Sequence, residues 1–329
     1  MIENSPAFSR YSILLISLTL ILFAGLRHNV GTDWEAYYNV YKYRDVGFIE
    51  MGYMFLNNTF SDFKLPYNIF LLTINSISII LVYKFIYKNS YLLVIPILIF
   101  YSDLYIYFNL SGIRQAIAIA ITCYSITFAI EKRRAKFLML TLLASLFHIT
   151  SLIFVLAYYI PKSKIKTKHL LLTLCLFYVT FLAINNISFF NNENLLKKIL
   201  WYTSFQENPP DLFTLYIIGT IKRFIVVGLI ILFGNNLLKK NNNRYFFNIY
   251  LFGLIIYLSS YMLSPDIGVR ISSYFIIFEI ILVGNLIYTT KRISNRLIIV
   301  TIFSIVSLYK LIGIMNDNSY NYSTLLNFF

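Results

Sequence analysis

The chain alternates long apolar segments with short polar ones along almost its whole length. A helix that crosses a membrane needs roughly 20 mostly apolar residues, and several segments approach or reach that length. They are residues 11–26, 66–87, 91–108, 111–130, 170–189, 212–234, 245–264, 270–289 and 296–315. The pattern predicts an all-α protein, a polytopic bundle of about nine membrane-spanning helices.

A further apolar run, 137–160, has basic residues on both flanks and His148 near its middle. Lys and Arg concentrate in cytoplasmic loops, so both flanks are expected on the same side of the membrane. Two half-helices of about 11 residues would each reach about 17 Å, past the midplane but not across. We therefore predict a re-entrant helical hairpin. The alternative is a tenth spanning helix, which would place the later basic clusters outside.

Composition supports a membrane protein. Of the 329 residues, 58% are hydrophobic and 13% are charged, and the mean hydropathy is +0.69. A soluble domain is about 45–50% apolar and about 25% charged, so this chain lacks the polar side chains to cover a water-exposed surface. Residues 1–329 are predicted to form one integral membrane domain, whose largest outer loops are 27–65 and 190–211.

The net charge is +14, and the positions of the basic residues are typical of a membrane protein. The basic residues cluster between apolar runs, as in 132–136, 162–168 and 239–244, which predicts that these segments are cytoplasmic. This distribution argues against nucleic-acid binding. The two cysteines, Cys123 and Cys175, lie inside apolar runs, where they are expected to pack rather than to react.

The outer loop 27–65 contains a predicted amphipathic helix. Thr32 and Glu35 have the spacing of a capping box. Tyr37 and Tyr41 follow one turn apart.

Four arginines lie at or within the apolar segments rather than in the basic clusters: Arg27, Arg114, Arg223 and Arg270. A cation inside hydrocarbon costs at least about 2.5 kcal/mol, so it usually faces a cavity, a partner or a ligand. On the predicted topology three of them lie at the outer ends of helices, with Arg223 deeper. Because guanidinium groups bind phosphates bidentately, they indicate a site for a lipid-linked diphosphate at the outer face.

Each of these residues also has a simpler explanation. Arg27 could reach lipid head groups, Arg223 could pair with Glu279, and Arg270 could bond Asp266 four residues earlier. His148 could be a hydrogen-bonded packing residue. The expectation of a site therefore rests on the joint placement of these residues.

Five short motifs occur in an order that resembles the EpsG/Wzy-like polysaccharide polymerases. They are RHNVGTDW at 27–34, followed by Tyr37; EMGY at 50–53; IRQAIA at 113–118; FHITS at 147–151; and RISSY at 270–274. Trp34 stands where the family pattern has Tyr, and Thr150 stands near the usual Ser. Each motif alone is weak, but the ordered set covers essentially the whole chain.

The resemblance implies a multi-pass glycosyltransferase of the bacterial plasma membrane. Such an enzyme polymerises undecaprenyl-diphosphate-linked oligosaccharide repeat units outside the membrane, for an O-antigen, capsule or exopolysaccharide. The flippase and chain-length regulator of the same pathway are then candidate partners. A lipid-linked glycan ligase would look nearly identical. A transporter or flippase of a lipid-linked glycan is the alternative from another class, although we see no internal repeat.

The predicted site combines these observations. His148, Asp33 and Glu50 are candidates for the base that activates or orients the acceptor hydroxyl. The four arginines are expected to bind the diphosphate. The aromatic side chains Trp34, Tyr37, Tyr53 and Tyr274 are candidates for stacking on sugars, although an interfacial aromatic belt would look similar. No acidic cluster such as Asp-x-Asp occurs, so we predict no metal, no other cofactor and no nucleotide-sugar donor.

Overall fold

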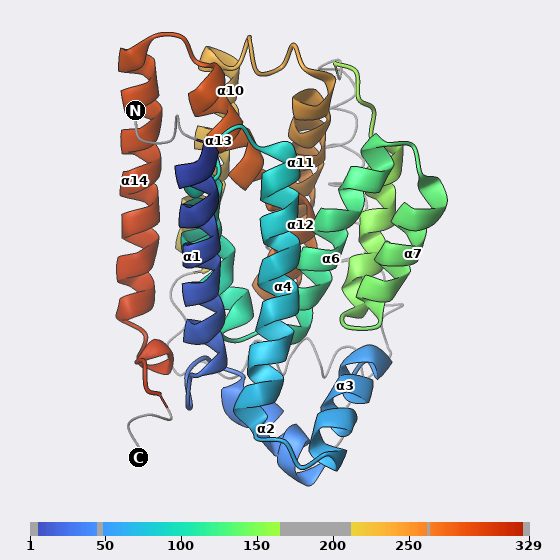
Figure 1. The fold of residues 1–329 in the computed structure, drawn as a ribbon. Coiled ribbons are helices and arrows are strands. Elements are labelled where there is room, and N and C mark those ends of the chain that lie inside the picture. The colour runs from blue at the N-terminus through green and yellow to red at the C-terminus, as the bar shows by residue number, and fades with distance from the viewer. Residues whose placement is uncertain (1–5, 45–48, 165–211, 262–263, 325–329) are drawn as a thin grey trace. The chain divides into compact units, whose positions relative to one another are not determined.

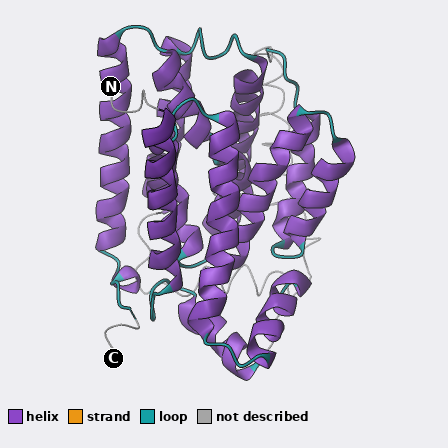
Figure 2. Cartoon of the chain, viewed as in Figure 1, coloured by secondary structure: helices purple, strands orange, loops and turns teal. Residues whose placement is uncertain are grey.

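A computed structural model describes residues 6–44, 49–164, 212–261 and 264–324 (Figures 1 and 2). Within these ranges every regular element is a helix, and the one extended feature is an isolated bridge between Arg27 and Thr324. The predicted all-α class is therefore confirmed. The expected span 170–189 and the outer loop 190–211 lie outside the described residues.

The chain divides into two compact units. The first consists of residues 1–158 and 280–329, and the second of residues 159–279. Each unit is described by itself below. The single membrane domain expected for residues 1–329 stays a prediction.

The first unit holds most of the helices. They are α1 (Pro6–Gly25), α2 (Trp34–Tyr43), α3 (Met51–Asp62), α4 (Tyr67–Asn89), α5 (Val94–Phe100), the π-helix η2 (Tyr101–Asn109), α6 (Ile113–Ile130), α7 (Arg134–Ser145), the 3₁₀-helix η3 (Ile149–Tyr159), α13 (Glu279–Thr289), α14 (Ile293–Met315) and the short η5 (Asn318–Tyr320). The first residue of α13 and the last of η3 belong to the second unit.

In the first unit α4 packs against α1 and α6, and α6 packs in turn against α7. Of the most apolar window of α6, 78% is buried, against 11% for α14. Some core polar groups bond one another: the Asn109 amide donates to Asn75 at 3.0 Å and to Ser78 at 3.2 Å. Helix α6 is therefore central in this unit, whereas α14 leaves most of its apolar surface uncovered.

The second unit contains α10 (Leu212–Phe233), α11 (Asn241–Ser260) and α12 (Pro265–Ile276). Helices α11 and α12 pack closely because Gly253 lets them approach. A Cβ atom at Gly253 would lie 2.6 Å from the Cβ of Phe275. Ser264 caps α12 by accepting a hydrogen bond from the backbone N–H of Ile267.

Fewer helices qualify as membrane spans than the nine or ten expected. Among the described residues four are long and apolar enough, namely 67–89, 113–130, 215–233 and 293–315, or five if α12 and α13 form one bent span. Shorter apolar helices cover 10–25, 94–109 and 149–159. The length of an apolar segment does not reveal whether its helix is interrupted. The segment 91–108, for example, forms a short α-helix followed by a π-helix.

The run 137–160 is also broken, as predicted. Helix α7 ends at Ser145 and η3 starts at Ile149, with His148 between them. The ring of Phe137 lies 5.9 Å from Phe154 and 5.5 Å from Tyr158, so the start of α7 faces the end of η3. The two arms are antiparallel, about 18 Å long for α7 and about 22 Å for η3, although η3 is a 3₁₀-helix rather than the expected α-helix.

The expected capping box of α2 does not form. The helix starts at Trp34 with Asp33 as its N-cap, and the Asp33 side chain makes no cap hydrogen bond. Instead Asp33 accepts a hydrogen bond from the Thr32 hydroxyl at 3.1 Å, so the two polar side chains satisfy each other. Tyr37 and Tyr41 are nevertheless one turn apart in α2 and both buried, as predicted.

The hairpin generates a topology test. In a variant whose Cys123 and Cys175 are replaced by Ser, single cysteines at Lys132 and Lys162 should react with a membrane-impermeant maleimide only after permeabilisation. Asp62→Cys, in the predicted outer loop, should react in intact cells and serves as the control. Reaction of the positions 132 and 162 from opposite sides would show that the run 137–160 crosses the membrane.

Candidate functional site

The loop after α1 buries an arginine. The side chain of Arg27 has no exposed surface. Its Nε donates to the carbonyl of Val30 at 3.2 Å and its Nη1 donates to the carbonyl of Ala24, so the side chain holds the turn at the end of α1. Its Nη2 is buried without a partner among the described residues. This burial contradicts the simpler explanation that Arg27 reaches lipid head groups.

The groups around Arg27 are aromatic hydroxyls. Tyr53, Tyr67, Tyr105 and Tyr322 lie within electrostatic reach of its guanidinium. The hydroxyls of Tyr53 and Tyr67 are also buried without a described partner, and burial raises the pKa of Tyr53 well above its usual value.

No ion pair between described residues involves Arg27. A buried cation that lacks a counter-charge is costly. This pocket of donors therefore favours an anion.

The residues near the C-terminus line the same loop, which the sequence pattern did not predict. His28 N donates to the Ser323 carbonyl at 2.9 Å, and Gly31 N donates to the Ser319 carbonyl at 2.7 Å. The ring of Tyr322 stacks on Phe23 of α1 with centroids 4.0 Å apart. Nothing in the polar, Asn-rich composition of 316–324 signals such a contact.

Gly31 explains part of the first motif. Its φ is +97°, a conformation in which glycine is favoured. A Cβ atom there would lie 2.0 Å from the carbonyl oxygen of Leu110. The next residue, Thr32, donates its backbone N–H to the Ser111 hydroxyl at 3.0 Å. The motif glycine thus brings the loop 27–33 against the start of α6.

A half-buried carboxylate, that of Glu50, joins three of the sequence motifs. Glu50, the N-cap of α3, forms an ion pair through Oε2 with Arg114 at the start of α6. Its Oε1 lies 3.0 Å from Nδ1 of His148 and accepts the backbone N–H of Ile149 at 3.3 Å. Arg114 also donates from Nε to the Tyr37 hydroxyl at 3.1 Å. The structure therefore brings together four residues that the sequence singled out for different roles: Arg114, Glu50, His148 and Tyr37.

This contact determines which nitrogen of His148 can do chemistry. An ionised carboxylate only accepts hydrogen bonds, so Nδ1 carries the proton that Glu50 accepts. In the neutral ring Nε2 then has a free lone pair. His148 is 8% exposed, and its Nε2 has no partner in the described part of the chain. The arrangement presents a buried acceptor nitrogen with a fixed orientation.

Burial alone would raise the pKa of Glu50, but the hydrogen bond from His148 and the charge of Arg114 outweigh it. Together they lower the pKa to about 2, from an ordinary 4.5. Glu50 is therefore ionised at neutral pH, which is the state that the contact with His148 Nδ1 needs.

Gly52 is the reason that α3 can approach His148. Its N–H donates to the Leu146 carbonyl at 2.8 Å. A Cβ atom at this position would lie 2.8 Å from both the carbonyl oxygen and the Cβ of Leu146. Since Leu146 precedes His148 by two residues, the glycine of the second motif sets the distance between Glu50 and the break of the hairpin.

The four aromatic residues expected to contact sugars are all buried. Trp34 and Tyr37 are each 6% exposed, and Tyr53 and Tyr274 are 0% exposed. In the first unit Tyr37 packs against Tyr53, with ring centroids 5.5 Å apart, and Trp34 packs against Tyr67 at 5.7 Å. The three rings of the first unit are therefore packed in its interior.

Asp33 does not pair with Arg27, although the sequence spacing made that pair possible. Its carboxylate is bound by the Thr32 hydroxyl, and Arg27 bonds backbone carbonyls instead. Asp33 is half-buried at the start of α2.

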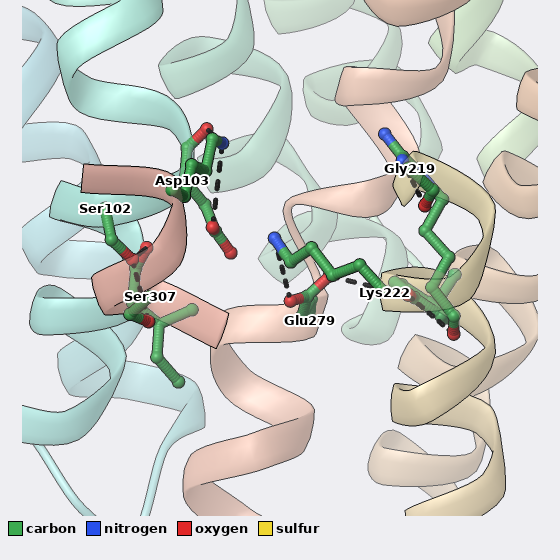
Figure 3. Close-up of polar contacts among 10 residues, drawn as sticks. Ser102, Asp103, Gly219, Lys222, Glu279 and Ser307 are labelled. Carbon is green, nitrogen blue, oxygen red and sulfur yellow. Dashed lines mark hydrogen bonds and ion pairs between the residues drawn. The ribbon is translucent and has the colours of Figure 1, made fainter. Parts of the chain in front are cut away.

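Arg223 and Arg270 belong to the second unit. The guanidinium carbon of Arg223 lies 3.5 Å from the ring centroid of Tyr257, and its Nη1 donates to the Gly219 carbonyl at 2.7 Å. The expected partner of Arg223, Glu279, is paired with Lys222 instead, at 3.5 Å (Figure 3). Arg270 bonds Asp266 at 2.6 Å, as its simpler explanation predicted.

A further polar group was missed by the sequence. In the first unit Lys310 of α14 lies 3.6 Å from the Asp103 carboxylate and donates to the Asp103 carbonyl at 2.5 Å. The Ser102 hydroxyl donates to Ser307 at 3.1 Å (Figure 3). These contacts fasten α14 to the π-helix η2, and π-helical turns are frequent at functional sites. Two charges inside apolar runs, Asp103 in 91–108 and Lys310 in 296–315, could have indicated them.

Among the described residues no three His, Cys, Asp or Glu side chains are grouped as a metal site requires. Metal-independent activity stays a prediction.

Comparison with known proteins supports the resemblance. Residues 10–326 match the EpsG family, which is nearly the whole chain. No curated protein and no solved structure matches.

The ion pair at Glu50 predicts a pH-dependent stability. Because the folded-state pKa is lowered, the carboxylate stabilises the fold above its unfolded pKa of about 4.5, and this contribution is lost as pH falls toward 2. Glu50→Gln should reduce the free energy of unfolding at pH 7 by at most about 3 kcal/mol. Thermal melts of purified protein across pH 3–7 should show the difference from wild type shrinking as pH falls.

The matched control is Asp62→Asn. Asp62 pairs with Arg44, but both side chains are more than half exposed, so this substitution should change stability little. A deficit of Glu50→Gln that stays constant down to pH 3 would contradict the low pKa of Glu50.

Proposed function

Because the chain belongs to the EpsG family, we propose that it polymerises lipid-linked oligosaccharide repeat units for a bacterial surface polysaccharide. The family supports a polymerase-like role in polysaccharide biosynthesis. The finer proposal is a glycosyltransferase of the plasma membrane that acts at its outer face on undecaprenyl-diphosphate-linked units. The observation that carries it is the buried Nε2 of His148, held by Glu50 and without a described partner.

The reaction is a transfer at an anomeric carbon. A hydroxyl of the incoming unit attacks the sugar that links the growing chain to its lipid diphosphate. A new glycosidic C–O bond forms, the C–O bond to the diphosphate breaks, and undecaprenyl diphosphate leaves with the bond electrons. The hydroxyl proton goes to His148 Nε2. The products are a chain longer by one unit and the free lipid diphosphate.

His148 suits the role of base because its orientation is fixed. Glu50 holds Nδ1–H and so leaves Nε2 as the acceptor, and it stabilises the imidazolium that forms. Arg114 holds the other oxygen of Glu50. Glu50 is therefore a positioning residue in this proposal. Asp33, half-buried at the start of α2, remains the alternative for orienting the acceptor.

Arg27 is the arginine best suited to the leaving diphosphate. Arg114 is neutralised by Glu50 and Arg270 by Asp266, whereas Arg27 has no acidic partner among the described residues. Developing negative charge at the diphosphate would be stabilised by a donor that is already fixed in place. Tyr53 and Tyr67 would add their unpaired hydroxyls. Arg223 and Arg270 of the second unit are proposed as phosphate-binding residues from the sequence alone.

The aromatic residues Trp34, Tyr37, Tyr53 and Tyr274 are proposed to shape the sugar-binding region. No divalent metal is proposed, since the arginines supply the positive charge that a metal supplies in other transferases. The chain is proposed to be a multi-pass protein of the plasma membrane with a re-entrant hairpin that carries His148. The flippase and chain-length regulator of the pathway are its proposed partners.

The base assignment is tested by His148→Gln and Glu50→Gln. With purified protein and lipid-linked repeat units, His148→Gln should slow chain growth by 10²- to 10⁴-fold, the usual contribution of a general base. It should bind the lipid-linked unit as wild type does. Glu50→Gln should slow growth less, because it disturbs the orientation of His148 and leaves the base in place.

Glu131→Gln is the control, since Glu131 pairs with Lys88 away from these motifs, and it should polymerise normally. Normal chain growth in His148→Gln would make His148 a packing residue. Transfer of one glycan to a foreign acceptor would identify a ligase, and wild-type protein that moves the lipid-linked unit without chemistry would identify a transporter.

The role of Arg27 predicts that the product stabilises the protein. Undecaprenyl diphosphate should raise the melting temperature of purified wild-type protein, because it neutralises a buried charge. Arg27→Lys should weaken this binding at least 10-fold, since Lys lacks the planar fork of donors. The exposed Arg44→Lys should bind normally. An unchanged melting temperature of the wild type would refute this anion site.

A further inference from the structure

One face of α4 carries an apolar groove. Its volume is about 460 Å³, and it is lined by Ile69, Leu72, Thr73, Ser76, Ile77, Ile80 and Leu81. These positions recur at intervals of three and four residues, so they form one stripe along the helix. From Ile69 to Leu81 the stripe is about 18 Å long, which is 12 residues at 1.5 Å each.

The groove suits a hydrocarbon chain. Ile69, Ile77 and Ile80 are 42%, 37% and 44% exposed, so the stripe remains uncovered by the described residues. The hydroxyl of Thr73 donates to the Ile69 carbonyl at 2.8 Å and so does not require an outside partner. Since α4 is one of the helices long and apolar enough to cross a membrane, the groove would run in the direction of the lipid chains.

One end of the groove lies beside the Arg27 loop. Leu72 touches Gly25, where an added Cβ atom would lie 2.3 Å from a Leu72 methyl carbon. Asn68 donates to the Gly25 carbonyl at 3.3 Å. Gly25 precedes Arg27 by two residues, and Tyr67, the first residue of α4, is within electrostatic reach of Arg27. The apolar groove therefore begins next to the loop that holds Arg27.

We propose that this groove binds the isoprenoid chain of the lipid-linked substrate, with the diphosphate at the Arg27 end. An anionic head next to an apolar tail matches a buried cation next to an apolar stripe. The stripe lies on a single helix and fits one chain, whereas a phospholipid has two. The inference rests on the proposed function, because it assigns the lipid part of the same substrate.

A photoaffinity experiment tests the groove directly. Full-length protein in lipid nanodiscs is irradiated with undecaprenyl diphosphate that carries a diazirine on its chain, and the labelled peptides are identified by mass spectrometry. Label should fall within residues 69–81. Ile77→Trp and Ile80→Trp fill the groove and should reduce the labelling of residues 69–81 at least 10-fold. Ile305→Trp, on the exposed face of α14, should label as wild type does.

A diazirine-labelled phosphatidylglycerol identifies the alternative occupant. If it labels residues 69–81 as strongly as the isoprenoid probe and undecaprenyl diphosphate fails to displace it, the groove holds an ordinary membrane lipid and the proposal is wrong. Displacement by undecaprenyl diphosphate would support it.

Kinetics with substrates of different chain length separate this proposal from the polymerase itself. In Ile77→Trp the KM for an undecaprenyl-linked unit should rise about 10-fold with kcat little changed. The KM for a unit on a short, two-isoprene carrier should stay as in wild type. A wild-type KM for the long substrate would refute the groove while the polymerase proposal stands. Groove labelling in a wild-type protein that makes no polymer would refute the polymerase proposal alone.

Discussion

The carboxylate of Glu50 is the interaction on which the rest of the first unit's site depends. It is the one group that contacts both Arg114 of α6 and His148 at the break between α7 and η3. An ionised carboxylate is costly to bury unless its oxygens are bonded, and here both are. Removing it would leave Arg114 without a counter-charge and His148 without a fixed tautomer. The same contact thus stabilises the fold and fixes the orientation of His148.

Arg27 poses the opposite problem, because its charge is buried and has no acidic partner in the described residues. Its hydrogen bonds to backbone carbonyls explain where the side chain lies. They do not offset the free-energy cost of burying its charge. The groups near its guanidinium are tyrosine hydroxyls rather than carboxylates. The protein alone therefore satisfies this cation poorly. Among the described residues of the motifs 27–34 and 113–118, Arg114 is therefore neutralised by a carboxylate, whereas Arg27 is buried without an acidic partner. That division could not be drawn from sequence, where the two arginines look alike.

The sequence predicted the local features well. Hydropathy predicted the all-α class, and the basic residues on both flanks of 137–160 predicted the break at His148. The ordered motifs predicted the family and contain the residues that meet at Glu50. The sequence did not predict the features that depend on contacts between residues far apart in the chain. The residues 319–324 pack on the Arg27 loop through backbone bonds that no side-chain pattern encodes. Lys222 rather than Arg223 reaches Glu279. Among the described residues fewer helices qualify as spans than expected, partly because breaks within apolar runs, as in 91–108, leave hydropathy unchanged.

Two glycines show why the motifs have their form. Gly31 and Gly52 each lie where a Cβ atom would collide with a backbone carbonyl, that of Leu110 and that of Leu146. Any larger residue would push the Arg27 loop from α6 or α3 from the hairpin. Since α3 presents Glu50 and the hairpin presents His148, a displacement of one Ångström would break a 3.0 Å contact. The motif glycines therefore act on the site through distance: they set how closely the backbones approach, and this fixes the contact between Glu50 and His148.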